Sequence, residues 1–255
     1  LDFFDLRRFS SGGDLLIESA NGAVEQAAGS RIDVSAAGKP AGSVRVTATG
    51  ADGRVQLSGA ILGTSPVARE SGRIDIRARA LDDFAGLNRR LNEGGVLGGR
   101  GFVVKTGDLV IGDELRANRI EVSADGGALT VNGRIDASGE DVGTIRLAAR
   151  DNLVLAPGAV LDARGTRLAL DGRGQAIEAS NRAQIELASA AGTVRLDPSA
   201  VIDLRAADAV ARGRLEINAP RVGGDGVAVD AAAGLSMRGA ESIAVNAFAR
   251  HAPAD

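Results

Sequence analysis

The chain has 255 residues, a net charge of −3, no cysteine, one histidine and an aromatic content of 2%. Without cysteine, thiolate catalysis and cysteine–zinc sites are excluded, and the single His251 supports neither a histidine triad nor a histidine-rich metal site. The balanced charge and the lack of stacking aromatics predict no nucleic-acid partner. No apolar run reaches the ~18 residues that indicate a membrane-spanning segment.

Residues 1–12 precede the first repeat and contain Phe3, Phe4 and Phe9, half of the phenylalanines in the chain. We expect them to form an N-terminal flap or partial rung that packs on the first full coil. The alternative is an apolar end that a preceding rung covers in the parent protein. The chain begins without Met, and we read it as a piece of that longer protein.

From residue 13 onward, short phrases of alternating apolar and polar residues recur and are separated by turns rich in glycine. One phrase is found at 13–17, 42–46, 72–76, 107–111, 143–147, 183–187 and 213–217. A second phrase follows it at 30–38, 133–139, 159–165 and 200–206. Each has the length and the period of a short β-strand.

Most units carry three such strands and no helix, which predicts an all-β parallel β-helix, or β-solenoid. Successive coils would stack about 4.8 Å apart in one elongated domain over residues 13–247. Inward side chains would then form aliphatic columns, with Ile74, Ile145, Leu147, Ile185 and Ile202 among them. The first inward residues of the units are expected to be Leu16, Val44, Ile74, Leu109, Ile145, Ile185 and Leu215.

Two stretches interrupt the repeat. In residues 80–98, Leu81, Phe84, Leu87 and Leu91 recur at helical spacing, which predicts a short helix near 81–92 between rungs and against the solenoid wall. This insertion either packs on the coils or contacts another chain, and the residues for that contact would be Phe84, Leu87, Arg89 and Arg90. Residues 166–182 are polar and predict a second insertion, and residues 248–255 predict a frayed tail.

Aspartates occupy the same place in four copies of the second phrase: Asp33, Asp136, Asp162 and Asp203. In a carbohydrate-cleaving β-helix enzyme, carboxylates would be unique and gathered in one groove. A carboxylate that recurs in every copy is better explained as closing its strand by a hydrogen bond to a turn amide. The sequence therefore predicts no catalytic residue, no cofactor and no metal site.

Four phrases resemble the rod repeats of filamentous haemagglutinins, the large exoproteins that Gram-negative bacteria export by two-partner secretion. They are GSVRVTATG (42–50), GRVQLSGAILGTS (53–65), NLVLAPGAVLDARGT (152–166) and GTVRLDPSAVIDL (192–204). The resemblance implies a right-handed winding, an outer-membrane two-partner-secretion transporter as partner, and a secreted or cell-surface location. It also implies adhesion to a host-surface glycan or protein, biofilm formation or delivery of a toxin.

The expected function is therefore structural and not enzymatic: a shaft segment of a secreted bacterial adhesin. Two alternatives stay open. One is a carbohydrate-active β-helix enzyme of the lyase or glycoside hydrolase type. The other is a glycan- or protein-binding module that acts through residues 80–98 or 166–182.

Overall fold

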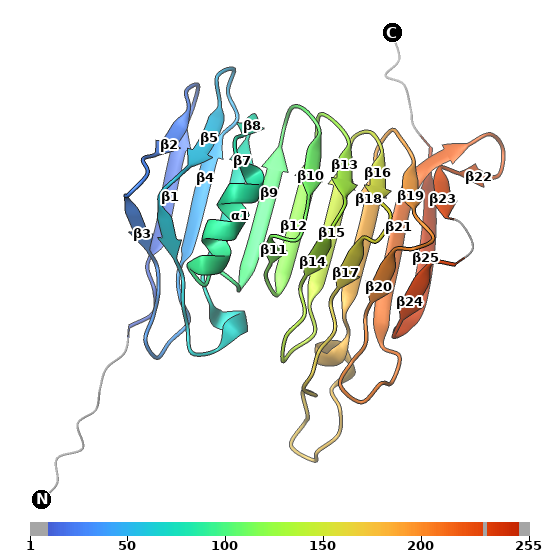
Figure 1. Cartoon of the computed structure of the whole chain (residues 1–255). Helices are drawn as coiled ribbons and strands as arrows, with labels where there is room; N and C mark the ends of the chain where they lie inside the picture. The colour runs from blue at the N-terminus through green and yellow to red at the C-terminus, as the bar shows by residue number, and fades with distance from the viewer. Residues whose placement is uncertain (1–9, 232–233, 250–255) are drawn as a thin grey trace, which may run out of the picture.

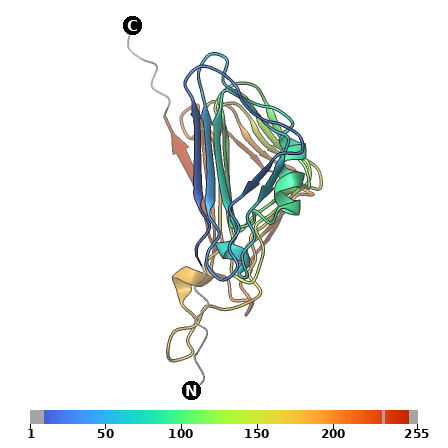
Figure 2. The same cartoon turned by 90° about the vertical axis from the view of Figure 1, so that its left-hand side faces the viewer.

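The structure, a computed structural model, describes residues 10–231 and 234–249. The chain winds into coils that stack along one axis, and the end-on view shows a roughly triangular outline (Figures 1 and 2). This is the architecture of a parallel β-solenoid, as the repeat predicts. Most of the predicted flap, residues 1–9, and of the predicted tail, residues 250–255, lie outside the described residues.

One face of the stack is a single sheet in which one strand from each coil pairs with the next. The main ladder is parallel throughout, and only β22 (Gly226–Val227) joins it as the antiparallel arm of a hairpin with β21. In spatial order the parallel strands are β1 (Asp14–Ser19), β4 (Ser43–Ala48), β7 (Arg73–Ala78), β9 (Gly99–Val104), β12 (Arg119–Ala124), β15 (Thr144–Ala149), β18 (Gln184–Ser189), β21 (Gly213–Val222) and β25 (Ala240–Phe248).

The second and third faces are each divided into two shorter sheets. The second face holds β2 (Val24–Gln26), β5 (Arg54–Leu57) and β8 (Ala80–Leu81), and then β10 (Leu109–Ile111), β13 (Leu129–Val131), β16 (Leu153–Leu155), β19 (Val194–Leu196) and β23 (Val229–Ala231). The third face holds β3 (Arg31–Asp33) and β6 (Ala60–Leu62), and then β11 (Leu115–Arg116), β14 (Arg134–Asp136), β17 (Val160–Asp162), β20 (Val201–Asp203) and β24 (Ser236–Arg238).

The interruption lies in the third coil, where helix α1 (Phe84–Glu93) stands in place of the third strand. The Asp83 side chain caps it by accepting a hydrogen bond from the Gly86 amide at 3.1 Å. Its inward face buries Phe84, Leu87 and Leu91. The predicted helix is thus confirmed, but it replaces a strand and is not inserted between rungs, because three apolar residues at helical spacing close the coil as a strand would.

Alternate residues of the strands point inward and form the predicted aliphatic core. The expected column residues Ile74, Ile145, Leu147, Ile185 and Ile202 are all buried. They line up from coil to coil, as in the pairing of Ile145 with Ile185 and of Leu147 with Leu187. A side chain of this size contributes about 1.5 to 3 kcal/mol when it is fully buried, so each coil is held mainly by its neighbours.

One expected inward position is wrong, and a second points inward from a different face. Leu16 is 58% exposed, because β1 pairs with β4 one residue out of the expected register, so that Leu15 instead of Leu16 lies beside Val44. The adjacent Leu15 and Leu16 fit either register, and the partner strand decides between them. Leu109 is buried but belongs to β10 on the second face.

The first face of coils four and five is formed by β9 and β12, which are not among the repeated phrases of the sequence. Their inward residues aligned with Ile74 are Arg100 and Ile120. An arginine at an inward position breaks the apolar alternation, and this is why the sequence pattern failed here.

Arg100 is a guanidinium buried among aliphatic side chains, and it ties β9 to α1. It donates to the Asn88 side-chain oxygen at 3.0 Å, to the Asn92 side-chain oxygen at 2.7 Å and to the Val96 carbonyl at 3.1 Å. Burial lowers the pKa of Arg100 to about 9, which leaves it charged at neutral pH. The turn at the end of α1 is therefore held by a charged group that fills the interior where a strand is missing.

Candidate functional site

The four residues expected to contact a partner do not form one surface. Phe84 is 7% exposed and Leu87 is fully buried. The Phe84 ring packs edge-on against Phe102, with 5.0 Å between the ring centroids. The partner contact is therefore wrong for Phe84 and Leu87, whose apolar side chains close the coil.

The two arginines of α1 differ from each other. Arg90 donates to the Leu57 carbonyl at 2.7 Å and pairs with Asp83 at 3.1 Å, so it fastens the helix to the coil beside it. Arg89 is exposed. Of the expected contact residues, only Arg89 extends freely from the helix surface.

The repeated aspartates have the predicted structural role. The carboxylate of each accepts a hydrogen bond from the amide two residues later, at 3.0 to 3.2 Å, and the four pairs are Asp33–Ser35, Asp136–Ser138, Asp162–Arg164 and Asp203–Arg205. Three of them, Asp136, Asp162 and Asp203, stack on successive coils of the third face. Asp33 lies on the separate sheet before α1.

The stacked carboxylates repel one another, and neighbouring arginines offset this repulsion. Asp162 is nearly buried and is paired with Arg134 and, at 3.2 Å, with Arg164. Burial raises the pKa of Asp162 in spite of these partners, and the charge of Asp203 adds to that effect. At Asp203 burial acts in the same direction, but hydrogen bonds from the side chain and the amide of Arg205 outweigh it and lower the pKa. In the exposed Asp33, hydrogen bonds from Arg31 and Ser35 lower the pKa to about 2.

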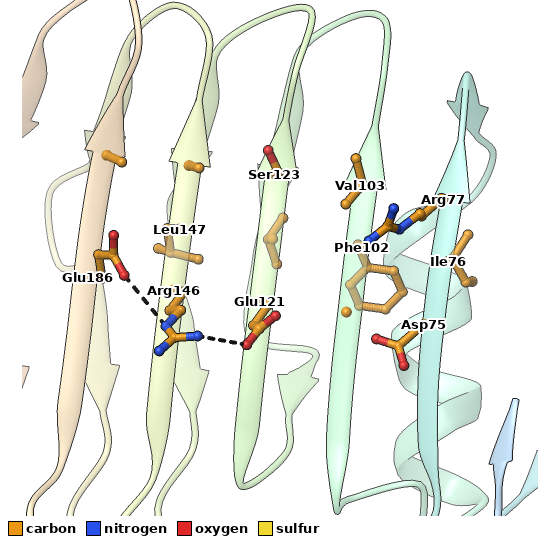
Figure 3. A pocket seen from close by; sticks show the side chains of 14 residues that line it. Asp75, Ile76, Arg77, Phe102, Val103, Glu121, Ser123, Arg146, Leu147 and Glu186 are labelled. Carbon is orange, nitrogen blue, oxygen red and sulfur yellow. Dashed lines mark hydrogen bonds and ion pairs between the residues drawn. The ribbon is translucent and has the colours of Figure 1, made fainter. Parts of the chain in front are cut away.

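The outer side of the first sheet carries a shallow groove of about 270 Å³ across β7, β9, β12, β15 and β18 (Figure 3). Arg146 lies between Glu121, at 3.3 Å, and Glu186, at 3.5 Å, so charges alternate along one row. Gly101 has no side chain in this row, and the Asp75 carboxylate takes up that space, since a Cβ built at Gly101 would lie 2.3 Å from one of its oxygens. The charged side chains of this row pair with one another across neighbouring strands, as they do on a solvated strand face.

A larger cleft of about 600 Å³ lies at the corner between the third face and the first. Residues 66–70, which include the 3₁₀ turn η1 (Ala68–Glu70), form one wall, and residues 138–141 form the other. The floor includes Leu97, Ala117 and Asn118. The cleft exists because coil four turns into coil five through only two residues, 117 and 118, while longer loops project on both sides.

The cleft is polar, and arginines engage most of its carboxylates. Arg69 reaches Asp141 on the opposite wall at 3.3 Å. Arg167 comes from the 166–182 stretch and pairs with Glu140 at 3.1 Å and with Asp141 at 3.4 Å. On the floor side, Arg116 pairs with Asp136 at 3.3 Å. The arrangement offers hydrogen-bonding groups to a polar ligand, but each of these carboxylates already has a guanidinium partner.

The repeat pattern of the sequence does not point to Arg69, Glu140 or Asp141. Arg69 and Asp141 come from corners three coils apart, and a contact across that separation leaves no local pattern. The available signal was the interruption of the repeat at 139–143, where a Glu-Asp pair stands between glycines. Residues 166–182 project beyond the coils (Figure 2) and include the 3₁₀ turn η2 (Glu178–Asn181).

A metal site, a membrane-spanning helix or a known relative would each point to a function. In the described part of the chain, no three His, Cys, Asp or Glu side chains are grouped so that they could hold a metal ion. Among these same residues, α1 and the short 3₁₀ turns fall well below the length that a membrane-crossing helix requires. Comparison with family models, with curated proteins and with solved structures found no match for this chain.

Proposed function

We propose that this chain is a shaft segment of a large exported surface protein, similar in kind to the filamentous haemagglutinins of Gram-negative bacteria. The observation that carries the proposal is the first sheet, which runs from β1 to β25 without a break. A solenoid grows in length with every coil, because each coil contacts only its neighbours. Such a molecule holds a distant part of the same protein away from the cell surface.

The contacts between side chains also favour a load-bearing role. Inward columns of aliphatic residues, the stacked aspartates and the Arg146 row all join one coil to the next. Charges of both signs on the outer face, such as those of Arg146 and Glu186, keep it solvated and discourage pairing with other sheets. These features favour a role in holding neighbouring coils together along the axis, and they do not favour a role in catalysis.

The proposal includes export through an outer-membrane two-partner-secretion transporter and a secreted or surface-bound location. Folding coil by coil would suit a chain that emerges from a transporter end first. The absence of cysteine suits passage through an oxidising compartment, where free thiols would cross-link. We also propose a right-handed winding, since parallel strands joined by a crossover are right-handed in nearly all proteins.

The polar cleft favours one second candidate, a module that binds a glycan or protein there. Its Glu140 and Asp141 lie outside the repeated phrase, as residues of a specific site would. A sugar-cleaving enzyme is favoured less. That chemistry uses one carboxyl as a proton donor and another as nucleophile or base, whereas Glu140, Asp141 and Asp136 are all engaged by arginine.

The two candidates predict different effects of deleting a coil. In a shaft only the number of coils affects adhesion, whereas in a binding module the coil that carries the cleft is required. Removal of residues 119–143 deletes one coil together with a wall of the cleft, whereas removal of residues 184–213 deletes one coil and leaves the cleft intact. Each junction lets strands stack in register, because Ile120 and Ile145 occupy equivalent places, as do Ile185 and Leu215.

The measurement is adhesion of the producing bacterium, after surface display of each deleted protein has been verified. A shaft predicts equal and small losses for the two deletions, with larger losses as more coils are removed. Loss of adhesion with the 119–143 deletion alone would overturn the shaft in favour of the cleft.

A further inference from the structure

Residues 166–182, here called the arm, leave the sixth coil at the corner between the third and first faces and project beyond the coils (Figures 1 and 2). The base of the arm is bonded to the coils, because Glu178 pairs with Arg212 at 3.0 Å. The buried Asn181 side chain closes this base, since it accepts from the Ala169 amide and donates to the Ala169 carbonyl, both at 2.9 Å. The base of the arm is therefore fixed.

The tip of the arm, residues 171–175, has the sequence Asp-Gly-Arg-Gly-Gln and is exposed throughout. Its hydrogen bonds are internal, since the Asp171 carboxylate accepts from the amides of Arg173 and Gln175, both at 2.8 Å. A Cβ built at either glycine of the tip would have no neighbour within 4 Å. Within residues 10–231 and 234–249, no hydrogen bond or ion pair joins the tip to a coil. The tip can therefore open without disturbing the sheets.

The tip differs from the surroundings of other basic residues. In the sheets, the backbone at a residue such as Arg146 of β15 is paired with strands on both sides. At the corners, Arg69 belongs to the turn η1 and forms an ion pair across the polar cleft. Lys39 is followed by Pro40, whose ring replaces the amide hydrogen that a protease binds next to the bond it cleaves. Arg173 instead stands between two glycines in an open tip.

We infer that the arm is a processing site, at which a serine protease specific for basic residues cleaves the peptide bond between Arg173 and Gly174. A protease binds the residues on both sides of that bond in extended form, and exposed loop tips with small residues reach this form most easily. The glycines beside Arg173 let the backbone straighten. The reaction consumes one water molecule: the carbonyl carbon of Arg173 becomes a carboxylate, and the nitrogen of Gly174 becomes a free amine.

The cleaved chain stays one particle. Its two parts meet where the sixth coil stacks on the seventh, and β15 pairs with β18, β16 with β19 and β17 with β20 across this boundary. The inward pairs there include Ile145 with Ile185 and Leu161 with Ile202, and all four residues are buried. None of these contacts involves the tip, so cleavage leaves them in place. This inference goes beyond the proposed shaft function and does not depend on export or adhesion.

Brief digestion of the folded chain with trypsin, a serine protease of this specificity, tests the site. We expect the first internal cut after Arg173, and mass spectrometry would identify the new ends at Arg173 and Gly174. Arg173→Gln should slow the first internal cut by about tenfold or more, because a cut elsewhere requires a coil to open locally. A first cut at another position between residues 10 and 249 of the unmodified chain would overturn the inference.

Two matched variants show whether the tip itself is responsible. Arg195→Gln removes an exposed arginine from strand β19 and should leave the cut after Arg173 at its original rate. Arg173→Gln with Gln175→Arg moves the arginine by two positions within the tip and should restore a fast cut, now after position 175. If the moved arginine were not cleaved, the openness of the tip would not be the cause, and the inference would be wrong. Circular dichroism would check that each variant melts with the unmodified protein.

Size-exclusion chromatography of the cleaved chain tests whether the two parts stay together. After the protease is inhibited, both fragments should elute together in native buffer, at the volume of the uncleaved chain. The same sample should separate into two fragments in concentrated urea, which dissolves the contacts between the coils. Separate elution in native buffer, or a loss of β-structure in the circular dichroism spectrum on cleavage, would overturn the inference.

Discussion

The third and sixth coils solve the same packing problem in different ways. In the sixth coil, β15, β16 and β17 close all three sides, and the residues inside, such as Ile145 and Leu147, are aliphatic. In the third coil a helix closes the third side, two of the three faces lose their continuity, and Arg100 from the next coil fills the interior. A solenoid therefore tolerates a helix when one sheet stays continuous and a buried polar group ties the helix to it.

The most damaging change should be a charge inside a regular coil. Ile145→Asp or Leu147→Asp would bury a carboxylate among aliphatic neighbours without a partner. We expect a loss of roughly 4 kcal/mol or more in the free energy of unfolding, enough to melt the surrounding coils. Thermal unfolding followed by circular dichroism would measure it.

The control for this change is Val110→Asp, which places the same charge on the exposed side of a strand. It should shift the melting temperature little. If Leu147→Asp melted together with the unmodified protein, the inward columns of the regular coils would be wrong.

The next largest effect should come from the irregular coil. Arg100→Met fills a similar space but leaves the side-chain oxygens of Asn88 and Asn92 without their donor. Buried acceptors without a donor cost about 1 to 3 kcal/mol each, so we expect a loss of about 3 kcal/mol in urea unfolding. Hydrogen exchange should rise most in residues 84–96, which depend on Arg100 for their position.

A second variant separates lost hydrogen bonds from lost packing. Replacing Asn88 and Asn92 by Leu in the Arg100→Met background removes the orphaned acceptors, and it should recover part of the stability. No recovery would mean that Arg100 acts through its bulk alone. On the surface, Arg116→Met should cost less than about 1 kcal/mol, because its ion pair with Asp136 is exposed to solvent on the arginine side.

These two regions also separate what the sequence could predict from what it could not. Alternation identified Ile145, Leu147 and Ile185, because in regular coils every inward position is aliphatic. The helix was visible from the spacing of Phe84, Leu87 and Leu91, and the recurring aspartates identified their own turns. The alternation does not predict Arg100, where packing in three dimensions places a charge at a position that is aliphatic in the regular coils.

The register of β1 and the polar cleft were missed for a related reason. Leu15 and Leu16 are chemically alike, and only the partner strand distinguishes them. Arg69 and Asp141 lie 72 positions apart in the chain and meet only because the corners between them are short. Contacts between loops of distant coils have no period, so the repeat of the sequence does not predict them.

The stacked aspartates of the regular coils should give a smaller effect that depends on pH. Because hydrogen bonds lower the pKa of Asp203, its contribution to stability is present above about pH 3.9, the usual value in an unfolded chain, and is lost as the pH falls below it. Because burial raises the pKa of Asp162, its charged form opposes folding, and its contribution weakens as the pH rises from about 3.9 through the raised value.

The two substitutions to asparagine should therefore differ. Asp203→Asn should cost about 1 to 2 kcal/mol at neutral pH through its hydrogen bonds to Arg205. Asp162→Asn should cost less at neutral pH, and its deficit should grow as the pH is lowered toward 4. Urea unfolding of both variants between pH 3 and pH 7 would measure this, and parallel pH profiles would contradict it.

The smallest effect should be that of the ion pair across the cleft. Arg69 and Asp141 are 3.3 Å apart, but the arginine is more than half exposed, so side-chain entropy and screening offset most of their attraction. A double-mutant cycle with Arg69→Ala and Asp141→Ala should give a coupling of about 0.5 kcal/mol that falls further in 1 M salt. A coupling several times larger and insensitive to salt would mean that the two walls are clamped together. The pair would then brace the irregular third and fourth coils against the regular fifth coil, and the solenoid would depend on its loops as well as on its columns.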